Sequence, residues 1–159
     1  MAQGPLGIAI RVQLEPFDAG AELNAFCAGS RAVGGVASFI GLVRDLNLAS
    51  SVAELYLEHY PGMTERSLQA ICEESFQRWP LHAATVIHRY GNLLPGEPIV
   101  AVFCAATHRG EAFAACEFIM DYLKTRAPFW KRERTPDGLR WVDARESDAS
   151  AAQRWSEHG

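Results

Sequence analysis

Residues 107–133, THRGEAFAACEFIMDYLKTRAPFWKRE, indicate the fold class, because they predict a long helix between two strands. Apolar side chains recur at helical spacing along one stripe of this helix: Phe113, Cys116, Met120 and Leu123. The helix is expected to end before Pro128, because a proline disfavours helical geometry in the residue before it. Residues 129–135 are then predicted to form a strand. The turn PDG connects it to a second strand in LRWVDA, so the two form a closing hairpin.

The rest of the chain mixes strands and helices in the same way. Strands are predicted within five stretches: 7–14, 34–47, 51–60, 84–91 and 98–109. A short helix is predicted within 18–29, and a long one within 62–79, where Thr64 is expected to cap the first turn. Turns join neighbouring strands, so we expect one α+β domain over residues 1–159. It combines a mixed, largely antiparallel sheet with two long helices and a small C-terminal hairpin. The polar tail after about residue 146 is expected to be loosely held.

The composition describes an ordinary globular chain. Its 159 residues suffice for one domain with a proper core, with 48% hydrophobic and 21% charged residues. The net charge of -4 argues against a general nucleic-acid binder. The N-terminus lacks a signal-peptide pattern, and no apolar run approaches the roughly 20 residues that span a bilayer. We therefore expect no membrane association and a cytoplasmic location.

The four cysteines show no metal-binding spacing and lie among apolar neighbours, so buried reduced thiols are expected. His59 and His88 fall on predicted strands without a ligand partner at metal spacing. No zinc-protease, phosphate-loop or nucleophile-elbow motif is present. The sequence therefore predicts neither a metal nor a cofactor.

Two lysines in DYLKTRAPFWKRE raise a question in a chain of negative net charge. Lys124 lies one helical turn beyond Met120, at the edge of the apolar stripe. Lys131 follows Trp130 in an extended segment and must point to the opposite side from it. Both lysines are interpretable as solvated side chains that cover an apolar helix edge. The alternative is a cationic pocket in which repulsion depresses a lysine pKa toward neutrality, where the amine exchanges protons readily.

Other cations stand at the ends of predicted strands. His108 and Arg109 come where a strand ends and a helix begins, and a helix N-terminus binds anions readily. Arg44 follows the strand that contains Phe39, at the mouth of a polar loop. Taken alone, each of these residues is equally interpretable as an ordinary solvated surface residue.

Several stretches together resemble one known family. FIGLVRDLN, LEHYPGMTE, VIHRYGNLLPGE, residues 107–133 and RWVDARES occur in the order found in the catalytic (large) subunit of molybdopterin synthase, the MoaE family. The resemblance runs from about Gly34 to Trp155. The block DYLKTRAPFWKRE is its most distinctive part.

The resemblance implies a sulfurtransferase of molybdenum cofactor biosynthesis. Such an enzyme converts cyclic pyranopterin monophosphate (precursor Z) into the dithiolene molybdopterin in two sulfur transfers. The sulfur arrives as a thiocarboxylate on the C-terminal Gly-Gly tail of a small ubiquitin-like partner. The large subunit is expected to be a homodimer within a heterotetramer, with one small subunit at each far end.

The resemblance also implies roles for individual residues. Lys124 corresponds to the essential lysine and Lys131 to a second active-site lysine. Arg44, His108 and Arg109 correspond to residues that line the pocket for the pterin and its phosphate, with Phe39 nearby. Arg145 corresponds to an arginine that the neighbouring subunit contributes. Four further positions are expected beside the substrate: Leu42, Val43, Arg132 and Glu133.

Two other functions stay open at this stage. One is a non-catalytic module that binds a ubiquitin-like tail and uses the basic residues only to dock its carboxylate. The other is an enzyme whose lysine forms a Schiff base with a phosphorylated carbonyl substrate.

Overall fold

The computed structural model describes residues 7–44, 46–47, 50–51, 54–135, 138–142 and 146–157. Its helices are α1 (Ala19–Cys27), α2 (Met63–Arg78), α3 (Arg109–Arg126) and α4 (Glu146–Glu157). Its longer strands are β1 (Ile8–Gln13), β2 (Gly35–Leu42), β5 (Glu54–His59), β6 (Leu81–Arg89), β8 (Pro98–Ala106), β9 (Phe129–Thr135) and β10 (Gly138–Val142). Three short strands complete the described elements: β3 (Leu46–Asn47), β4 (Ser50–Ser51) and β7 (Gly91–Leu93).

The first sheet has the strand order β1-β6-β8-β2. Only the β1–β6 pairing is parallel, and β8 pairs antiparallel with both β6 and β2. At one end of the strands, a row of paired residues crosses this sheet: Val12, His88, Val100 and Gly41. At the other end of the strands, Ala106 pairs with both Leu81 and Gly35. These two rows mark the two ends of the sheet to which the candidate site residues belong.

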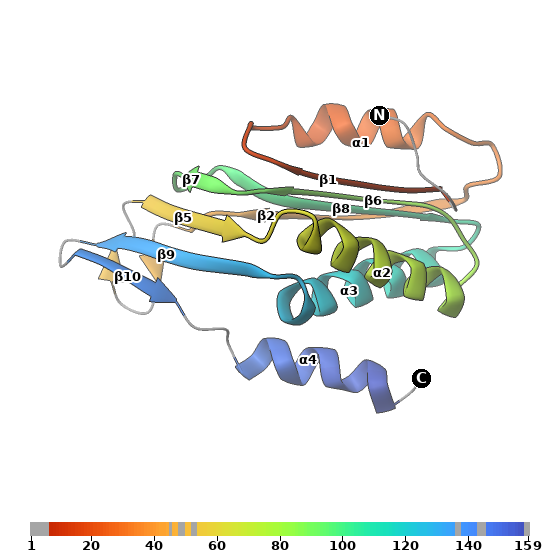
Figure 1. The fold of residues 1–159 in the computed structure, drawn as a ribbon. Coiled ribbons are helices and arrows are strands. Elements are labelled where there is room, and N and C mark those ends of the chain that lie inside the picture. The colour runs from red at the N-terminus through yellow and green to blue at the C-terminus, as the bar shows by residue number, and fades with distance from the viewer. Residues whose placement is uncertain are drawn as a thin grey trace.

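The second sheet has the order β10-β9-β5-β7 and is antiparallel throughout. It continues from one end of the first sheet, and its long strand β9 leads out of the end of α3 (Figure 1). The hairpin predicted near the C-terminus is therefore the β9–β10 edge of this sheet. The predicted α+β fold with a largely antiparallel, mixed sheet is confirmed.

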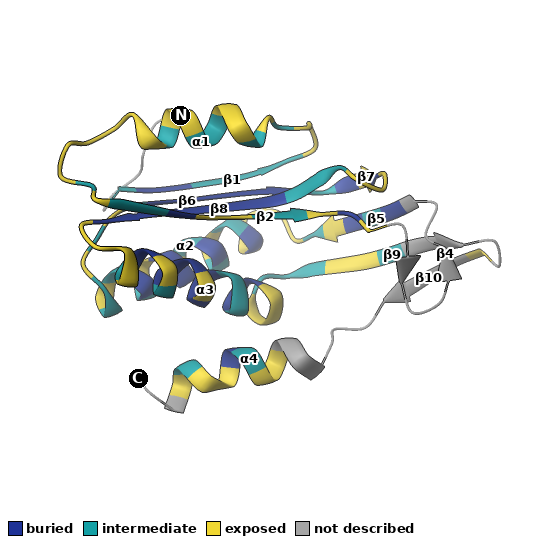
Figure 2. Cartoon of the chain, turned by 180° about the vertical axis from the view of Figure 1, so that it is seen from behind, coloured by how far each residue is buried: buried dark blue, intermediate teal, exposed yellow. Residues whose placement is uncertain are grey.

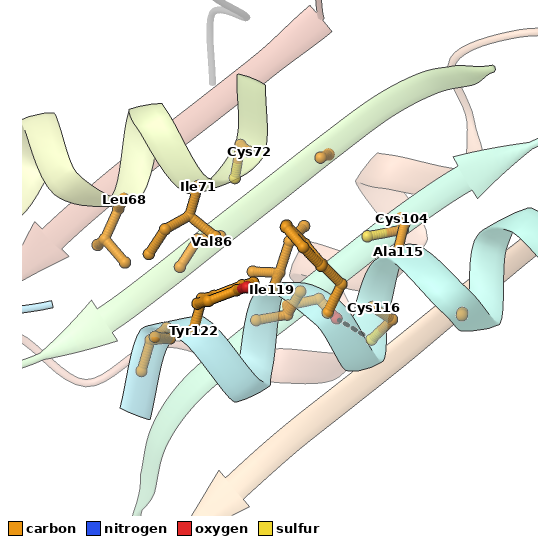
Figure 3. Close-up of a cluster of buried hydrophobic side chains, with 14 of the residues drawn as sticks. Leu68, Ile71, Cys72, Val86, Cys104, Ala115, Cys116, Ile119 and Tyr122 are labelled. Atoms are coloured by element: carbon orange, nitrogen blue, oxygen red, sulfur yellow. Dashed lines mark hydrogen bonds between the residues drawn. The ribbon is translucent and has the colours of Figure 1, made fainter. Parts of the chain in front are cut away.

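The helices form layers on the two faces of the first sheet (Figure 1). Helix α1 covers one face, α2 and α3 cover the other, and α4 lies on the far side of α3. The main core lies between the sheet and the α2–α3 pair, where α2 and α3 turn their buried faces toward β6 and β8 (Figures 2 and 3). Phe103 and Ile87 form a smaller core on the α1 face, packed by Phe26 and Leu23.

Two details of the long helices differ from the sequence prediction. Thr64 does not cap α2: Gly62, at φ 83°, is the cap residue, and its N–H donates to the Glu65 carboxylate at 2.6 Å. Thr64 lies in the first turn, where its hydroxyl donates to the Tyr60 carbonyl at 3.0 Å. The apolar stripe of α3 is also rotated, because Phe113 is 65% exposed. The helix lies on the sheet with these buried residues instead: Ala112, Ala115, Cys116, Phe118, Ile119, Tyr122 and Leu123.

Two further expectations concern the cysteines and the C-terminal segment. Cys72, Cys104 and Cys116 are buried, and burial raises the pKa of Cys72 to about 12. Cys27 is exposed near the end of α1, so the prediction was wrong for this residue. The segment expected to be loosely held forms α4, which packs on α3. None of the described helices combines the length and apolar character that a membrane span requires.

Candidate functional site

Lys124 and Lys131 reach the same end of the first sheet by different routes. Helix α3 starts beside Ala106, which pairs with Leu81 at the start of β6. It then runs back along the sheet in the direction of β6, so Lys124 in its last turn lies at the His88 end (Figure 1). Strand β9 begins three residues after α3 ends and carries Lys131. Besides burial, the positive charges of both lysines lower the pKa of His88, in keeping with their shared position at this end of the sheet.

Two apolar side chains, Leu57 and Phe129, neighbour Lys131 on its face of the second sheet. Lys131 pairs with Leu57, and Phe129 pairs with His59. Leu57 belongs to a buried cluster together with Val43, and Phe129 packs against that cluster. Alternate residues of a strand point to opposite faces, so Trp130 and Arg132 lie on the other face. The apolar wall beside Lys131 is therefore Phe129, whereas Trp130 is 49% exposed on the far side.

The residues predicted beside the substrate lie on two elements: Val43 follows β2, and Arg132 and Glu133 lie on β9. Val43 is buried, and its backbone exchanges hydrogen bonds with the turn before β8: its N–H donates to Glu97 and its carbonyl accepts from Gly96. Arg132 places its guanidinium 4.7 Å above the Tyr56 ring, on the face opposite Lys131. Glu133 pairs with Leu55 through the backbone. Arg145 lies outside the described residues.

Arg44, Leu42 and Phe39 lie along the outer strand of the first sheet. Leu42 and Arg44 are exposed where β2 ends, at the same end of the sheet as the lysines. Phe39 is 42% exposed, on the same side of the strand as the buried Ala37. Gly41 leaves room for this ring, because a Cβ there would lie 2.7 Å from Val100 Cγ1 and 3.3 Å from Phe39 Cε1. These residues lie on the β2 side of the end of the sheet that carries the two lysines.

His108 and Arg109 lie at the opposite end of α3. His108 is the extended residue before the helix, and Arg109 is its first residue. Gly34 lets this turn sit against β2, because a Cβ there would lie 2.1 Å from the Thr107 carbonyl oxygen. The two residues border an open cavity of about 800 Å³. The helix N-terminus, an imidazole and a guanidinium suit an anion such as phosphate.

One chain does not bring these two groups together. A helix rises about 1.5 Å per residue, so Arg109 and Lys124, fifteen positions apart on α3, lie about 22 Å apart. We call the region of Lys124, Lys131 and Arg44 the lysine end, and the region of His108 and Arg109 the arginine end. Within one chain, α3 therefore places these two groups of cations at opposite ends of the first sheet.

Sequence reasoning missed His88 and His59, which lie at the lysine end. The His88 ring is buried and stacks on Phe129, with ring centroids 3.8 Å apart. Burial, followed by the charges of Lys124 and Lys131, lowers the pKa of His88 to about 3. His59, the last residue of β5, pairs with Phe129 of β9, and its Nδ1 lies 3.3 Å from the Thr64 hydroxyl. Their position on strands gave no signal, since only the tertiary fold places them beside the lysines.

The described residues contain no group of three or more His, Cys, Asp or Glu side chains arranged to hold a metal ion.

Comparison with known proteins assigns this arrangement to a class. The family model described as MoaE protein matches residues 12–126. The chain is 57% identical over 150 residues to the molybdopterin synthase catalytic subunit of Pseudomonas aeruginosa, covering 94% of this chain and all of that protein. It is 57% identical over 141 residues to the Escherichia coli K12 protein of that name, covering 89% and 93% of the two chains.

Solved structures agree with the sequence relatives. The molybdopterin biosynthesis MoaE protein of Burkholderia ambifaria superposes with a TM-score of 0.80 at 53% identity, covering 94% of this chain and 98% of that one. A molybdopterin synthase structure from Staphylococcus aureus gives 0.77 at 28% identity, covering 84% and 96%. The fold and site thus define an α+β protein of molybdopterin biosynthesis. Within that class, the chain belongs to the MoaE family.

Proposed function

We propose that this chain is the catalytic subunit of a molybdopterin synthase and that its lysine end is where sulfur is transferred. The donor is the thiocarboxylated Gly-Gly tail of a small ubiquitin-like carrier, and the acceptor is cyclic pyranopterin monophosphate. The observation that carries the assignment of the site is that the last turn of α3, with Lys124, and β9, with Lys131, meet at one end of the first sheet, where Phe129 stacks on the buried His88 ring. Two amines on an otherwise acidic protein create a local cationic site for an anionic tail and an anionic substrate.

The lysines supply what sulfur transfer requires. The thiocarboxylate sulfur attacks a side-chain carbon of the pterin, and a new C–S bond forms as a C–O bond breaks. The departing oxygen needs a proton, which an ammonium group of Lys124 or Lys131 donates. Water then cleaves the acyl C–S bond, so the sulfur stays on the pterin and the carrier leaves with a carboxylate. A second carrier repeats the exchange on the neighbouring carbon.

The arginine end serves the same substrate from a second copy of the chain. Because about 22 Å separates Arg109 from Lys124 within one chain, a pterin held by Lys124 meets His108 and Arg109 only if these come from a partner copy. Exposed apolar side chains on the edge strand β2 and on α3 offer that copy a contact surface: Phe39, Leu42 and Phe113. In this arrangement Arg44 of one copy and His108 and Arg109 of the other bind the pterin phosphate.

The remaining residues take subsidiary positions in the proposal. Leu42 and Val43 border the substrate through the strand end that holds Arg44. Arg132 and Glu133 follow Lys131 along β9 and border the substrate through the backbone of that strand, and Arg145 reaches the pocket from the neighbouring copy. We further infer a cytoplasmic location, since the four cysteines are free thiols and reduced thiols are usual there.

Reconstitution tests this function. The protein is mixed with thiocarboxylated carrier and precursor Z, and molybdopterin is assayed by its oxidised fluorescent derivative. The matched control is the same carrier ending in an ordinary carboxylate, which should give no product. Carrier binding without product would instead show a non-catalytic docking module. Trapping of a substrate adduct by borohydride would show a Schiff-base enzyme.

A further inference from the structure

His88 is buried at the lysine end and has no part in the chemistry described so far. It lies next to last in β6, only 5% exposed, on the same face of the first sheet as Ala84 and Val86 of the main core. A polar ring in this position is costly unless its nitrogens are used. Its surroundings show what each part of the ring does.

One face of the ring holds the start of β9. The His88 and Phe129 rings are stacked at 3.8 Å and 19°. Phe129 is the first residue of β9 and shares a strand face with Lys131, two positions later. Aromatic stacking of this kind contributes beyond the area it buries. The stack therefore sets where the strand that carries Lys131 begins.

One nitrogen of the ring is already committed. His88 Nδ1 donates to its neighbour's carbonyl, the Arg89 oxygen, at 2.8 Å. That bond fixes the proton on Nδ1 and leaves Nε2 with a lone pair, so the ring is an acceptor. Burial is the main cause that lowers the pKa of His88 to about 3, and the positive charges of Lys124 on α3 and Lys131 on β9 lower it further, so the ring is neutral wherever the enzyme works. The His59 ring on β5 also faces His88.

We propose that His88 is a positioning residue for the two lysines, holding Phe129 with its ring face and accepting a hydrogen bond from a lysine amine through Nε2. The inference rests on the proposed function only for its kinetic readout. A neutral acceptor suits this place, because a third cation would repel both amines and a carboxylate would pair with one of them permanently.

Two substitutions separate the ring face from the nitrogen. His88→Phe keeps the stack and removes both nitrogens, whereas His88→Gln loses the stack and keeps an acceptor near the position of Nε2. For His88→Phe we expect kcat to fall about 10- to 100-fold with little change in the KM for precursor Z, since misplaced catalytic groups cost rates of that order. His88→Gln should recover part of that loss. His82→Phe, at the far end of the same strand, is the matched control for the pH profile.

The pH profile distinguishes positioning from a purely structural role. An ammonium that loses its acceptor is less stabilised and deprotonates at lower pH. The alkaline limb of the rate profile should therefore move down by about one pH unit in His88→Phe and stay in place in His82→Phe. A wild-type kcat, or a lower kcat with an unmoved limb, would overturn the proposal.

A spectroscopic measurement that keeps His88 in place needs no enzymatic activity. In protein with ¹⁵N-labelled histidine, the His88 Nε2 resonance should report a neutral acceptor above about pH 4. It should shift when Lys124→Ala or Lys131→Ala is introduced. If neither substitution moves it, His88 contacts no lysine and the proposal fails, whereas failure of the proposed function would appear as inactive wild-type enzyme with this shift intact.

Discussion

At the scale of single residues, two exposed cations in the last turn of α3 have different surroundings. Arg126 pairs with Glu74 at 2.9 Å and covers the Tyr122 ring at 3.7 Å. Lys124 lies at the same helix end, and its charge acts on the buried His88. The surroundings of Arg126 are those of a stabilising surface residue. Lys124 belongs to the end of the first sheet that also carries His88 and Lys131.

Replacing Lys124 by alanine should therefore remove activity without unfolding the protein. We expect molybdopterin formation to fall about 10²- to 10⁴-fold, the usual contribution of a positioned proton donor. Arg126→Ala removes a cation from the same helix end and should keep near wild-type turnover, because an exposed ion pair contributes only about 0–1 kcal/mol to stability. Turnover by a folded Lys124→Ala protein at the rate of Arg126→Ala would refute the assignment.

Substrate binding should depend on cations at both ends of α3. We expect Arg44→Ala and Arg109→Ala each to weaken precursor Z binding by about 1.5–3 kcal/mol, the value of a charge-assisted hydrogen bond. Arg11→Ala, on the opposite face of the first sheet where Arg11 pairs with Glu22, should leave binding unchanged. Calorimetric titration with precursor Z, with and without the carrier, measures this. Equal affinities in all three variants would contradict the proposed phosphate contacts.

At the scale of elements, α4 is docked on the core by a cluster of contacts around Trp155. The Trp155 indole N–H donates to the Asp121 carboxylate at 2.6 Å. Its ring packs edge-on against Trp79 and Phe118, with centroids 5.6 and 5.5 Å away. Arg154 adds a 2.9 Å ion pair to the same carboxylate. These contacts explain why a polar tail forms a docked helix.

Trp155→Ala should consequently lower the free energy of unfolding by about 2–3 kcal/mol, somewhat less than for a fully buried tryptophan. Trp130→Ala, in which a half-exposed ring is lost from β9, should cost under about 1 kcal/mol. Urea unfolding at one fixed protein concentration compares the two variants. Equal losses would mean that α4 is not held by this cluster.

The same elements show how far sequence can predict this fold. Strand and helix positions were predictable because Pro128 and the apolar spacing act locally. The cap of α2 was not, because the positive φ of Gly62 starts the helix one residue before Thr64. Nor was the buried face of α3: small residues such as Ala112 and Ala115 let the helix lie close to the sheet, and this turns Phe113 outward. Such rotations depend on the partner surface, which periodicity does not contain.

At the scale of the whole molecule, the candidate site was only partly predictable. The resemblance identified both lysines, and the structure gathers them at one end with Val43 and Arg44. It could not supply His88, whose place is set by the register of β6 and the stacking of Phe129. It also gave no warning that the length of α3 separates Arg109 from Lys124 by about 22 Å. We therefore propose that the complete site is built from two copies of the chain.

Mixed dimers test that claim most directly. Chains carrying Lys124→Ala are paired with chains carrying Arg109→Ala under distinct affinity tags, and the purified heterodimer is assayed for molybdopterin with thiocarboxylated carrier. If the lysine end of one copy works with the arginine end of the other, one site carries both defects and the other carries none. Activity should then rise to about half that of wild type, far above either mutant homodimer. The same pairing with Arg145→Ala tests whether Arg145 acts across the interface. A purified Lys124→Ala/Arg109→Ala heterodimer no more active than the two homodimers would contradict the two-chain site.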